Sequence, residues 1–496
     1  MERIHHFVGG KLTTGESGRH GEVFNPATGE QTHEVDFAAA EEVDAAVEVA
    51  TEAAASWRRQ SLARRADTMF RIRNVLDAHR ADLAAAVTAQ HGKVLSDAMG
   101  EVARGLENVE FACGIPRLLA GRYAEQASTG VDVCSIRQPL GVVAGITPFN
   151  FPVMVPMWMF ANAVAAGNAF VLKPSEKDPL APVLIAGLLA EAGLPDGIFN
   201  VVNGDKVAVD AVLEHPGIAA VSFVGSTPIA AHVYATAARH HKRVQALGGA
   251  KNHMVVLPDA DLDMAADAAV SAGYGSAGER CMAVSVVVAV GRVADDLVDA
   301  IAHRLPRLRI GDGRDPRSEM GPLVTREHRD RVAGYLDSAA SQGATVVVDG
   351  RAHPACKGPG FFLGASLLDE VTTEMDCYRD EIFGPVLSVV RARDYEEAIL
   401  LVNTNPYGNG AAVFTRDGGA ARRFQSEVEA GMVGVNVPIP VPVGYFSFGG
   451  WKQSLFGDTH IYGPESLNFY TRGKVVTSRW PDPATSSIDL GFPETH

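Results

Sequence analysis

Cys281 is the residue of this sequence with the clearest chemical potential. It lies in the run Gly278-Glu279-Arg280-Cys281, downstream of the turn Leu247-Gly248-Gly249. A thiol in a stretch of small residues is typical of a nucleophile that forms a covalent acyl intermediate. Alanine stands at position 246, directly before the turn, where a general base would be expected. The sequence therefore predicts that a reactive nucleophile, such as a second thiol, removes the acyl group.

Asn150 lies in a second polar motif, Thr147-Pro148-Phe149-Asn150-Phe151-Pro152, which follows a predicted strand. Two prolines restrict the backbone of this motif. An amide N–H presented in this way can donate a hydrogen bond to a developing oxyanion. A structural Asx turn is the alternative, and it is the commoner use of asparagine beside proline.

Two further motifs after predicted strands indicate a nucleotide site. Lys173 and Glu176, in Lys173-Pro174-Ser175-Glu176, can bond ribose hydroxyls, and the carboxylate would repel a 2′-phosphate, which favours NAD over NADP. Gly225 and Ser226 precede a predicted helix, whose N-terminus attracts a phosphate group. The usual G-x-G-x-x-G fingerprint does not occur. A surface ion pair and a simple turn are the structural alternatives for these two motifs.

The elements that must position these residues alternate between strand and helix. Segments 41–57 and 63–92 repeat apolar residues at spacings of three and four, which predicts helices. The strands that we predict next are 131–137, 141–147, 169–172, 199–202, 220–224 and 243–247, with helices at 179–192, 206–214 and 228–240. Strands that alternate with helices predict right-handed crossovers and an α/β fold with a doubly wound parallel sheet.

A second α/β half follows the first. Its predicted elements are helices at 261–274, 295–305 and 326–342 and strands at 285–290 and 344–348, with tail strands at 468–470 and 474–477. We expect an NAD-binding domain (residues 1–124 and 141–247), a catalytic domain (248–445) and a small strand-built oligomerisation element (125–140 and 464–496). Terminal strands often pair with another subunit, so we expect a homo-oligomer, taken as a dimer of dimers, although the sequence leaves dimer and tetramer open.

Composition excludes several classes of function. The chain has 496 residues and a net charge of −15, which argues against a nucleic-acid partner. Its five cysteines show no CxxC spacing and its histidines no metal-ligand spacing, so we predict no metal and a reducing, cytoplasmic location. The N-terminus is not a signal peptide. The uncharged stretch 152–172 contains proline, glycine and asparagine, and we interpret it as a buried helix and strand, not as a membrane span.

These motifs together resemble the aldehyde dehydrogenase superfamily over nearly the whole chain. The matching signatures are Pro148-Phe149-Asn150-Phe151-Pro152, Lys173-Pro174-Ser175-Glu176, Phe223-Val224-Gly225-Ser226-Thr227, Leu247-Gly248-Gly249, Gly278-Glu279-Arg280-Cys281 and Glu381-Ile382-Phe383-Gly384-Pro385. The resemblance implies that Cys281 is the nucleophile and that Asn150 and the Cys281 backbone N–H form the oxyanion hole.

The resemblance also implies the cofactor site. Glu381 and Phe383 would hold the nicotinamide ribose and ring of NAD, and Lys173 and Glu176 the adenosine ribose. From the matching motifs we assign a further set of residues to the cofactor site: Thr147, Phe149, Gly225, Ser226 and Gly248.

Three stretches narrow the resemblance to the methylmalonate-semialdehyde dehydrogenase family: 245–253, 278–283 and 101–111. That branch is acylating, so coenzyme A would be the co-substrate. Ala246 fits, because water attack would lack a general base worth ~10²–10⁴-fold. We expect NAD-dependent oxidation of methylmalonate semialdehyde, or malonate semialdehyde, to propionyl-CoA or acetyl-CoA with loss of CO₂. Which substrate is preferred, and which residues bind coenzyme A, the sequence leaves open.

The substrate carboxylate needs a partner, and two arginines are candidates. Arg280 adjoins the nucleophile, and Arg104 lies on a predicted helix that could reach the same mouth. Together they could clamp a carboxylate in a bidentate arrangement. The alternative for Arg104 is a solvated helix face. Two rival functions are a hydrolytic dehydrogenase that uses another base, such as Glu279, and an idle nucleotide-binding scaffold.

Overall fold

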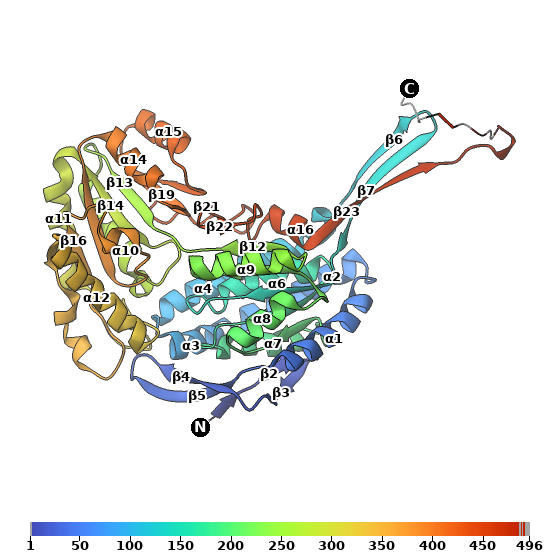
Figure 1. The fold of residues 1–496 in the computed structure, drawn as a ribbon, viewed down its shortest axis with the longest axis horizontal. Coiled ribbons are helices and arrows are strands. Elements are labelled where there is room, and N and C mark those ends of the chain that lie inside the picture. Colours follow the sequence, from blue (N-terminus) through green and yellow to red (C-terminus); the bar gives the residue numbers. More distant parts are fainter. Residues whose placement is uncertain (1, 486–487, 489, 492–496) are drawn as a thin grey trace.

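Two sheets of mainly parallel strands dominate the structure, a computed structural model that describes residues 2–485, 488 and 490–491 of the chain (Figure 1). One sheet lies in the body of the molecule, and the other in a second lobe on the left of the view. A three-stranded antiparallel arm projects from the body on the opposite side. The α/β fold class predicted from the sequence is confirmed.

Five parallel strands form the centre of the first sheet. They are β8 (Val142–Ile146), β9 (Ala169–Lys173), β10 (Phe199–Val201), β11 (Ile218–Val224) and β12 (Arg243–Leu247). The whole sheet has the order β22-β12-β11-β8-β9-β10-β2-β3, so β8 lies between β9 and β11. The strand order reverses at β8, and a crevice forms at the carboxyl ends of strands on either side of such a point. The doubly wound arrangement is therefore present.

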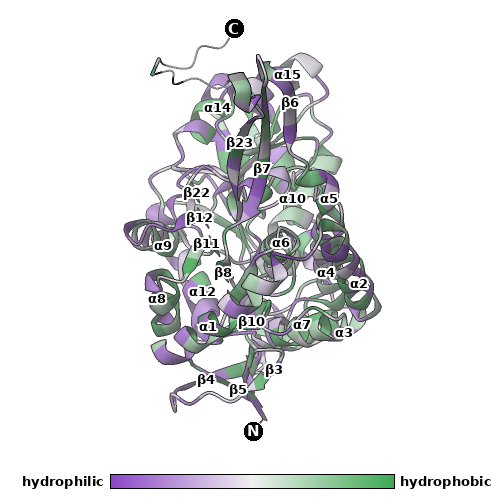
Figure 2. Ribbon diagram, turned by 90° about the vertical axis from the view of Figure 1, so that its right-hand side faces the viewer, coloured by the Kyte–Doolittle hydropathy of each residue, from purple (hydrophilic) through white to green (hydrophobic). Residues whose placement is uncertain are grey.

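Helices cover this sheet. They are α1 (Ala40–Trp57), α2 (Leu62–Ala78), α3 (Arg80–His91), α4 (Leu95–Cys113), α5 (Ile115–Leu118), α6 (Met154–Ala165), α7 (Leu180–Glu191), α8 (Lys206–Glu214) and α9 (Thr227–Arg239). Outer helices such as α2 carry both hydrophilic and hydrophobic residues (Figure 2), whereas every residue of α6 is buried. The uncharged stretch 152–172 is thus the core helix α6 followed by the buried strand β9, as predicted. The predicted helix 63–92 is interrupted at His79, where α2 ends and α3 begins.

The second sheet has the order β15-β16-β17-β14-β13-β19-β20. Its strands are β13 (Asn252–Val256), β14 (Val284–Val290), β15 (Thr345–Val348), β16 (Ser366–Asp369), β17 (Val386–Ala392), β19 (Gly410–Phe414) and β20 (Met432–Val435). The surrounding helices are α10 (Leu262–Tyr274), α11 (Ala294–Ala302), α12 (Arg326–Gln342), α13 (Asp376–Arg379), α14 (Tyr395–Thr404) and α15 (Gly418–Glu427). Only β15 runs antiparallel to its neighbour in this sheet.

Short strands complete the body. They are β1 (Glu2–Ile4), β2 (His6–Val8), β3 (Lys11–Thr13), β4 (His20–Asn25), β5 (Glu30–Asp36), β18 (Tyr407–Gly408), β21 (Trp451–Lys452) and β22 (Leu455–Phe456). Strands β2 and β22 pair antiparallel with β10 and β12, respectively. They therefore join the N-terminal and C-terminal parts of the chain to the first sheet.

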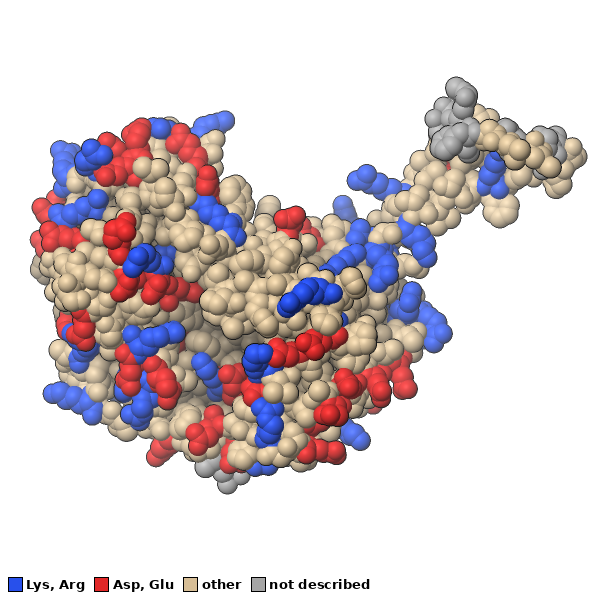
Figure 3. Space-filling model, in the orientation of Figure 1, with Lys and Arg blue, Asp and Glu red and all other residues tan. Residues whose placement is uncertain are grey.

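The arm consists of β6 (Arg122–Ser128), β7 (Val131–Pro139) and β23 (Thr471–Arg479). Strand β23 pairs with β7 from Thr471 to Arg479, so the tail and the segment after α5 form one sheet. Apolar side chains on it are exposed, including Tyr123 and Val475. Figure 3 shows that the face of the arm turned towards the viewer is mostly uncharged. The predicted oligomerisation element, 125–140 and 464–496, overlaps this arm, although residues 486–487, 489 and 492–496 lie outside the described residues.

The strand predicted at 468–470 is wrong, because these residues end helix α16 (Pro464–Tyr470). Pro464 suits a first helical turn, and Leu467, Phe469 and Tyr470 are buried. The Asn168 side-chain amide donates to the Tyr470 carbonyl, which fixes the end of the helix. Burial against the body thus decides the conformation of this short apolar run.

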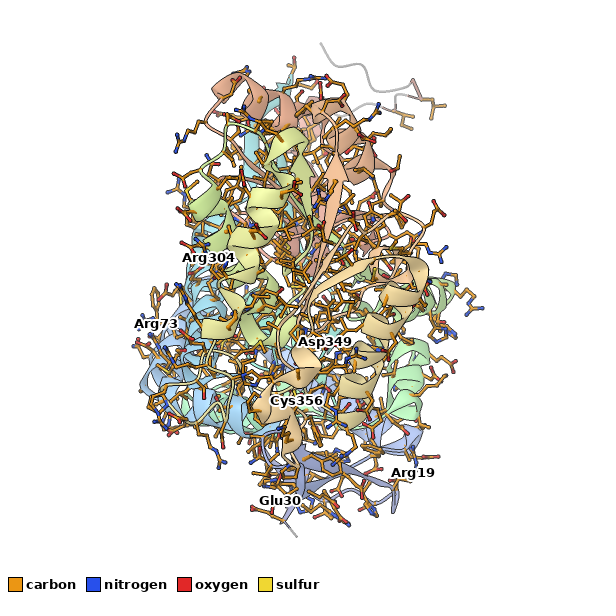
Figure 4. The ribbon with its side chains drawn as sticks, turned by 90° about the vertical axis from the view of Figure 1, so that its left-hand side faces the viewer. Arg19, Glu30, Arg73, Arg304, Asp349 and Cys356 are labelled. Atoms are coloured by element: carbon orange, nitrogen blue, oxygen red, sulfur yellow. The ribbon has the colours of Figure 1, made fainter. Side chains whose placement is uncertain are left out.

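The four cysteines other than Cys281 differ in their exposure. Cys113 and Cys377 are buried, whereas Cys134 and Cys356 are partly exposed. Cys134 belongs to the arm strand β7, and Cys356 lies near Asp349 among short turns at the surface (Figure 4). Neither the projecting arm nor a surface turn packs against a hydrophobic core, so the side chains of Cys134 and Cys356 stay partly exposed.

Candidate active site

The site lies where the carboxyl ends of the first sheet face the amino ends of the second. Asn150 follows β8, Gly225 follows β11, and Gly248 follows β12, while Cys281 and Glu381 precede β14 and β17. These segments enclose a cavity of about 400 Å³. The predicted site residues that line it are Phe149, Asn150, Gly225, Ser226, Gly248, Cys281, Glu381 and Phe383. The structure therefore brings most of the predicted constellation together.

Cys281 is partly exposed in the wall of this cavity. Its carbonyl accepts hydrogen bonds from the side-chain amides of Asn252 (2.9 Å) and Asn409 (3.0 Å), which fix the backbone of this predicted nucleophile. Burial, followed by the charge of Glu381, raises the pKa of the Cys281 thiol to about 12. The backbone N–H groups of Cys281 and Met282 act in the opposite direction. The charge of Arg280 also lowers the pKa, but burial outweighs it, and the thiol is mainly protonated in this state.

The turn before Cys281 is strained. Ser276 and Ala277 have φ values of 53° and 52°, and Gly278 has 76°. Left-handed conformations cost free energy for residues other than glycine and persist where the surroundings hold them. The Glu279 N–H donates to the Ser276 carbonyl and closes the turn. This tight turn presents Cys281 at the cavity.

Asn150 is nearly completely buried and its side-chain Nδ2 donates to the Glu279 carbonyl at 3.0 Å. The backbone carbonyl of Asn150 accepts a hydrogen bond from Lys93 Nζ at 2.5 Å. The Asx turn considered above is not among these contacts, since the amide reaches across to the segment before Cys281. One amide hydrogen thus fixes the side chain, and the other can donate to an oxyanion beside the thiol.

Glu381 and the two glycines after β12 form one wall. Glu381 Oε1 accepts from the Ala250 N–H at 2.9 Å, and a Cβ on Gly249 would lie only 2.3 Å from Glu381 Oε2. Gly249 is therefore needed for the close approach of the carboxylate. Burial raises the pKa of Glu381 to about 7, against the opposing charges of Lys251 and Arg331.

Phe149 and Phe383 form an aromatic wall. Their rings meet edge to face with centroids 5.9 Å apart. Phe383 has a positive φ of 58°, and its carbonyl accepts from His328 Nε2 at 2.7 Å. Lys177 Nζ lies 4.8 Å from the Phe149 ring centroid. These two rings offer an apolar surface beside the carboxylate of Glu381.

The segment after β11 begins α9 in the way that the sequence suggested. Pro228 lies in the first turn of α9, and Ser226 is its N-cap residue. The Ser226 side chain does not cap the helix, and Thr227 Oγ1 accepts instead from the Gly249 N–H at 2.8 Å. The first N–H groups of α9 thus have no side-chain cap, and Gly225 and Ser226 directly before them line the cavity, where this helix start could bind an anionic phosphate.

Three predicted cofactor residues lie outside the cavity lining. Lys173 ends β9 and its Nζ lies 3.3 Å from Glu176 Oε2. Burial lowers the pKa of Lys173, which Glu176 partly offsets. Thr147 is buried, and its N–H donates to the Lys173 carbonyl at 3.1 Å. All three residues lie at or just after the carboxyl ends of β8 and β9, and their assignment to a cofactor stays a prediction.

The two arginines of the predicted clamp lie in different surroundings. Arg280 Nη2 donates to Asp97 Oδ1 at 2.7 Å and lines a separate cavity of about 590 Å³. Arg104 contacts Glu107 Oε2 at 2.8 Å and donates to the Pro442 carbonyl. Arg104 is thus only partly exposed, and each guanidinium already has a carboxylate partner. Binding of a substrate carboxylate by both requires an exchange of partners, so the clamp stays a prediction.

Neither Ala246 nor Glu279 places a general base at the cavity of Cys281. Ala246 is fully buried within β12 and pairs with Phe223 and Phe456 on the neighbouring strands. Glu279, the base of the hydrolytic alternative, is also fully buried, with its carboxylate 3.6 Å from His91 Nε2 and 3.5 Å from His328 Nε2. Its carboxylate does not line the cavity of Cys281. Burial raises the pKa of Glu279 to about 8.

Several cavity residues were not foreseen from the sequence. They are Lys177, Thr325, Glu327, His328 and Arg331. Four of them lie at or after the N-terminus of α12, where Thr325 is the N-cap residue. The helix was predicted, but no motif or spacing relates it to Cys281. Only the tertiary structure reveals this contribution, because it places His328 of α12 against Phe149 and Phe383.

The described residues contain neither a cluster of potential metal ligands nor a helix suited to a membrane. No three His, Cys, Asp or Glu side chains come together there as potential metal ligands. None of the described helices is both long and apolar enough to cross a bilayer.

Comparisons with known proteins agree with this geometry. Residues 12–476 match the model of the aldehyde dehydrogenase family. A malonate-semialdehyde dehydrogenase of Pseudomonas aeruginosa is 53% identical over 99% of this chain and 100% of its own length. Malonate-semialdehyde dehydrogenase 2 of Geobacillus kaustophilus is 48% identical over 97% of this chain and 99% of its own.

Solved structures give the same result. The crystal structure of methylmalonate-semialdehyde dehydrogenase from Oceanimonas doudoroffii has a TM-score of 0.96 and 52% identity, covering 98% of this chain and 99% of that one. A protein of Sinorhizobium meliloti 1021, assigned as a methylmalonate-semialdehyde dehydrogenase and solved with NAD, has a TM-score of 0.96 and 54% identity over 98% of this chain and 99% of its own. This chain is therefore an enzyme and belongs to the aldehyde dehydrogenase family.

Proposed function

We propose that this enzyme catalyses the NAD-dependent, coenzyme A-acylating oxidation of methylmalonate semialdehyde and malonate semialdehyde. The products are propionyl-CoA and acetyl-CoA, respectively, with loss of CO₂. The observation that carries the proposal is the cavity that Cys281 and Asn150 share, together with the residue at position 246. That residue is a buried alanine, which cannot act as a base. The names of the relatives support the substrate class, and the NAD complex of one of them supports the cofactor.

The residues of the cavity fit a dinucleotide. The first turn of α9 after Gly225 and Ser226 suits the pyrophosphate, since its N–H groups are not capped by Ser226. Glu381 Oε2 is free to accept from ribose hydroxyls, and Phe383 and Phe149 offer an apolar surface for the ring. Lys173 and Glu176 would hold the second ribose. When bound, NAD⁺ supplies the hydride acceptor.

Cys281 and Asn150 would carry out the first half of the reaction. The Cys281 thiolate attacks the aldehyde carbon, and the carbonyl oxygen becomes an oxyanion that accepts hydrogen bonds from Asn150 Nδ2 and the Cys281 backbone N–H. The oxyanion then collapses to a carbonyl as the hydride leaves the carbon. The result is an acyl group bound to Cys281 as a thioester.

In the second half, the Cys281 thioester is cleaved by the thiol of coenzyme A. The coenzyme A thiolate adds to the thioester carbonyl, and collapse of the adduct breaks the bond to Sγ, so that Cys281 leaves as the thiolate. The carboxylate lies β to the thioester carbonyl, so its C–C bond electrons can pass into a thioester enolate as CO₂ departs. Protonation of the enolate carbon gives propionyl-CoA or acetyl-CoA.

A hydrolytic aldehyde dehydrogenase is the alternative function. One observation favours it, since Glu381 shares the cavity with Cys281 and has a pKa near neutrality. However, Glu381 already accepts from the Ala250 N–H, and ribose binding would occupy its other oxygen. The enclosed position of Glu279 gives it no contact with the cavity. We therefore favour coenzyme A over water as the acceptor.

We also propose a homo-oligomer, a dimer of dimers, that assembles through the arm. Val475 and Tyr123 are exposed there to 68% and 66%, respectively, on a mostly uncharged surface. Sheets with exposed apolar faces and edges commonly pair with another copy of the chain. A cytoplasmic location remains the expectation from the cysteine pattern.

The decisive experiment measures NADH formation from both semialdehydes with and without coenzyme A, with products identified by mass spectrometry. We expect a single burst of NADH without coenzyme A and sustained turnover with it. The Cys281→Ala variant should form no NADH. Sustained turnover to a free acid without coenzyme A would contradict the acylating mechanism and favour the hydrolytic one.

A further inference from the structure

Lys93 and Glu101 form an ion pair that is fully enclosed beneath the segment that carries Asn150. Lys93 Nζ lies 2.7 Å from Glu101 Oε2, and neither side chain has any exposed surface. An enclosed ion pair loses hydration and persists only where further hydrogen bonds satisfy its atoms. In this pair, the further bonds all go to the residues from Asn150 to Met154.

The pair holds both ends of that segment. Lys93 Nζ donates to the Asn150 carbonyl at 2.5 Å. Glu101 Oε1 accepts from the backbone N–H groups of Val153 (2.8 Å) and Met154 (3.1 Å). These N–H groups lie at the start of α6 and have no partner within the helix, and a carboxylate there also complements the helix dipole. The turn is thus closed by two opposite charges, one at each end.

The Asn150 side chain is fixed from a third direction, because its Nδ2 donates to the Glu279 carbonyl. The backbone position therefore comes from Lys93 and Glu101, and the amide orientation from the segment before Cys281. We infer that the Lys93–Glu101 pair is a positioning device that holds the Asn150 amide at the place where the oxyanion forms. This inference rests on the proposed role of Asn150 as an oxyanion-hole donor.

Displacement of a catalytic group by about 1 Å can cost ~10²-fold in rate. The removal of one oxyanion donor costs a similar factor, ~10²–10³-fold. Loss of the pair should therefore slow the step in which the oxyanion forms and collapses. It should leave the binding of NAD unchanged, because neither residue lines the cavity of Cys281.

The test uses the variant Lys93→Met/Glu101→Gln, which removes both charges and leaves no unpaired one. The glutamine oxygen can still accept from the start of α6. We expect the rate of the NADH burst, measured in the full-length enzyme without coenzyme A, to fall by ~10²-fold, with an unchanged dissociation constant for NAD⁺.

Lys242 provides the matched control. It is also a buried lysine whose Nζ donates to backbone carbonyls, those of His215 and Ile218, but it lies away from the cavity. The Lys242→Met variant should lose thermal stability and retain the burst rate within about 2-fold, as expected for a distant site. This control separates a local effect on Asn150 from a general loss of stability.

A double-mutant cycle with Asn150→Ala shows whether the pair acts through Asn150. In the Asn150→Ala background, the loss of the pair should slow the burst by less than about 2-fold, since residues that act as one unit are not additive. An equal slowing in both backgrounds would overturn the inference, and so would a folded variant with a normal burst. If the double variant does not fold, Glu101→Gln alone is subjected to the same cycle, with the same criteria.

The burst precedes any contact with coenzyme A. Sustained turnover without coenzyme A would therefore refute the proposed acyl acceptor, but the burst rates of the variants could still be compared. Conversely, a failed cycle would refute the positioning role and leave the acylating reaction untouched.

Discussion

At the scale of single residues, the reactivity of Cys281 depends on the charge of Glu381. Burial and this carboxylate raise the pKa of the thiol to about 12, while the pKa of Glu381 is itself about 7. Above pH 7 the carboxylate is ionised and opposes formation of the thiolate. Below pH 7 it is protonated and its influence vanishes.

The Glu381→Gln variant should consequently alkylate faster at Cys281. We expect a roughly 3- to 10-fold higher rate with iodoacetamide at pH 8.5 in the unliganded protein, because a lower thiol pKa increases the thiolate fraction. The rates should converge below pH 7. Peptide mass spectrometry measures the reaction, with Glu327→Gln as the control carboxylate of the same cavity. An unchanged or slower rate at pH 8.5 would contradict the coupling.

Arg280 is expected to recognise the substrate carboxylate once it leaves Asp97. The Arg280→Gln variant should lower kcat/KM for malonate semialdehyde by ~10- to 100-fold, the value of one charged hydrogen bond of about 1.5–3 kcal/mol. For propanal, which lacks the carboxylate, the change should be small. Arg304 (Figure 4) lines the cavity of about 590 Å³ that Arg280 also lines, and it is held by Asp263 and Asp267. The Arg304→Gln variant is therefore the control. Equal losses for both aldehydes would contradict this role.

At the scale of elements, the arm strand β23 is the segment whose surface most needs a partner. A charge at Val475 would oppose burial of the exposed apolar face on another subunit. The Val475→Glu variant should therefore shift the protein to a smaller assembly in light-scattering chromatography. Lys474→Glu places the same residue at the neighbouring exposed position of β23 and serves as the control. A variant that keeps the full assembly would argue against the arm as the contact.

At the scale of the whole molecule, the buried carboxyl group of Glu279 makes stability depend on pH. Its pKa is about 8 in the folded state and 4.5 ordinarily, so the folded state retains its proton longer than the unfolded state. The resulting stability is complete below pH 4.5 and is lost as the pH rises to about 8. A glutamine at position 279 stays neutral, so its contribution to stability does not fall as the pH rises.

At pH 9 the Glu279→Gln variant should therefore have a higher free energy of unfolding than the parent protein, by up to a few kcal/mol, and a higher Tm. At pH 5 the advantage should be smaller. Thermal unfolding at fixed protein concentration measures this, with the exposed Glu374→Gln as control. The same variant should retain coenzyme A-dependent turnover, because Glu279 is not the base. A lower Tm at pH 9 would contradict the pH argument.

Much of the fold was predictable because each element leaves a local pattern. The alternation of short β-branched runs and amphipathic segments predicted β8 to β12 and the helices between them. The strand prediction at 468–470 failed for a physical reason. A run of three residues that includes large side chains can form either a strand or the end of a helix, and here the burial of α16 against α6 decides.

The sequence by itself determined the chemistry that we propose for the site, since Cys281, Asn150, Glu381 and Ala246 lie in motifs whose residue types and order predict these roles. The tertiary structure decided which distant segments meet them. The first turns of α12, the Asp97 partner of Arg280 and the Lys93–Glu101 pair have no common motif with the nucleophile. Contacts between segments far apart in the chain arise from packing and burial, which local sequence patterns do not encode.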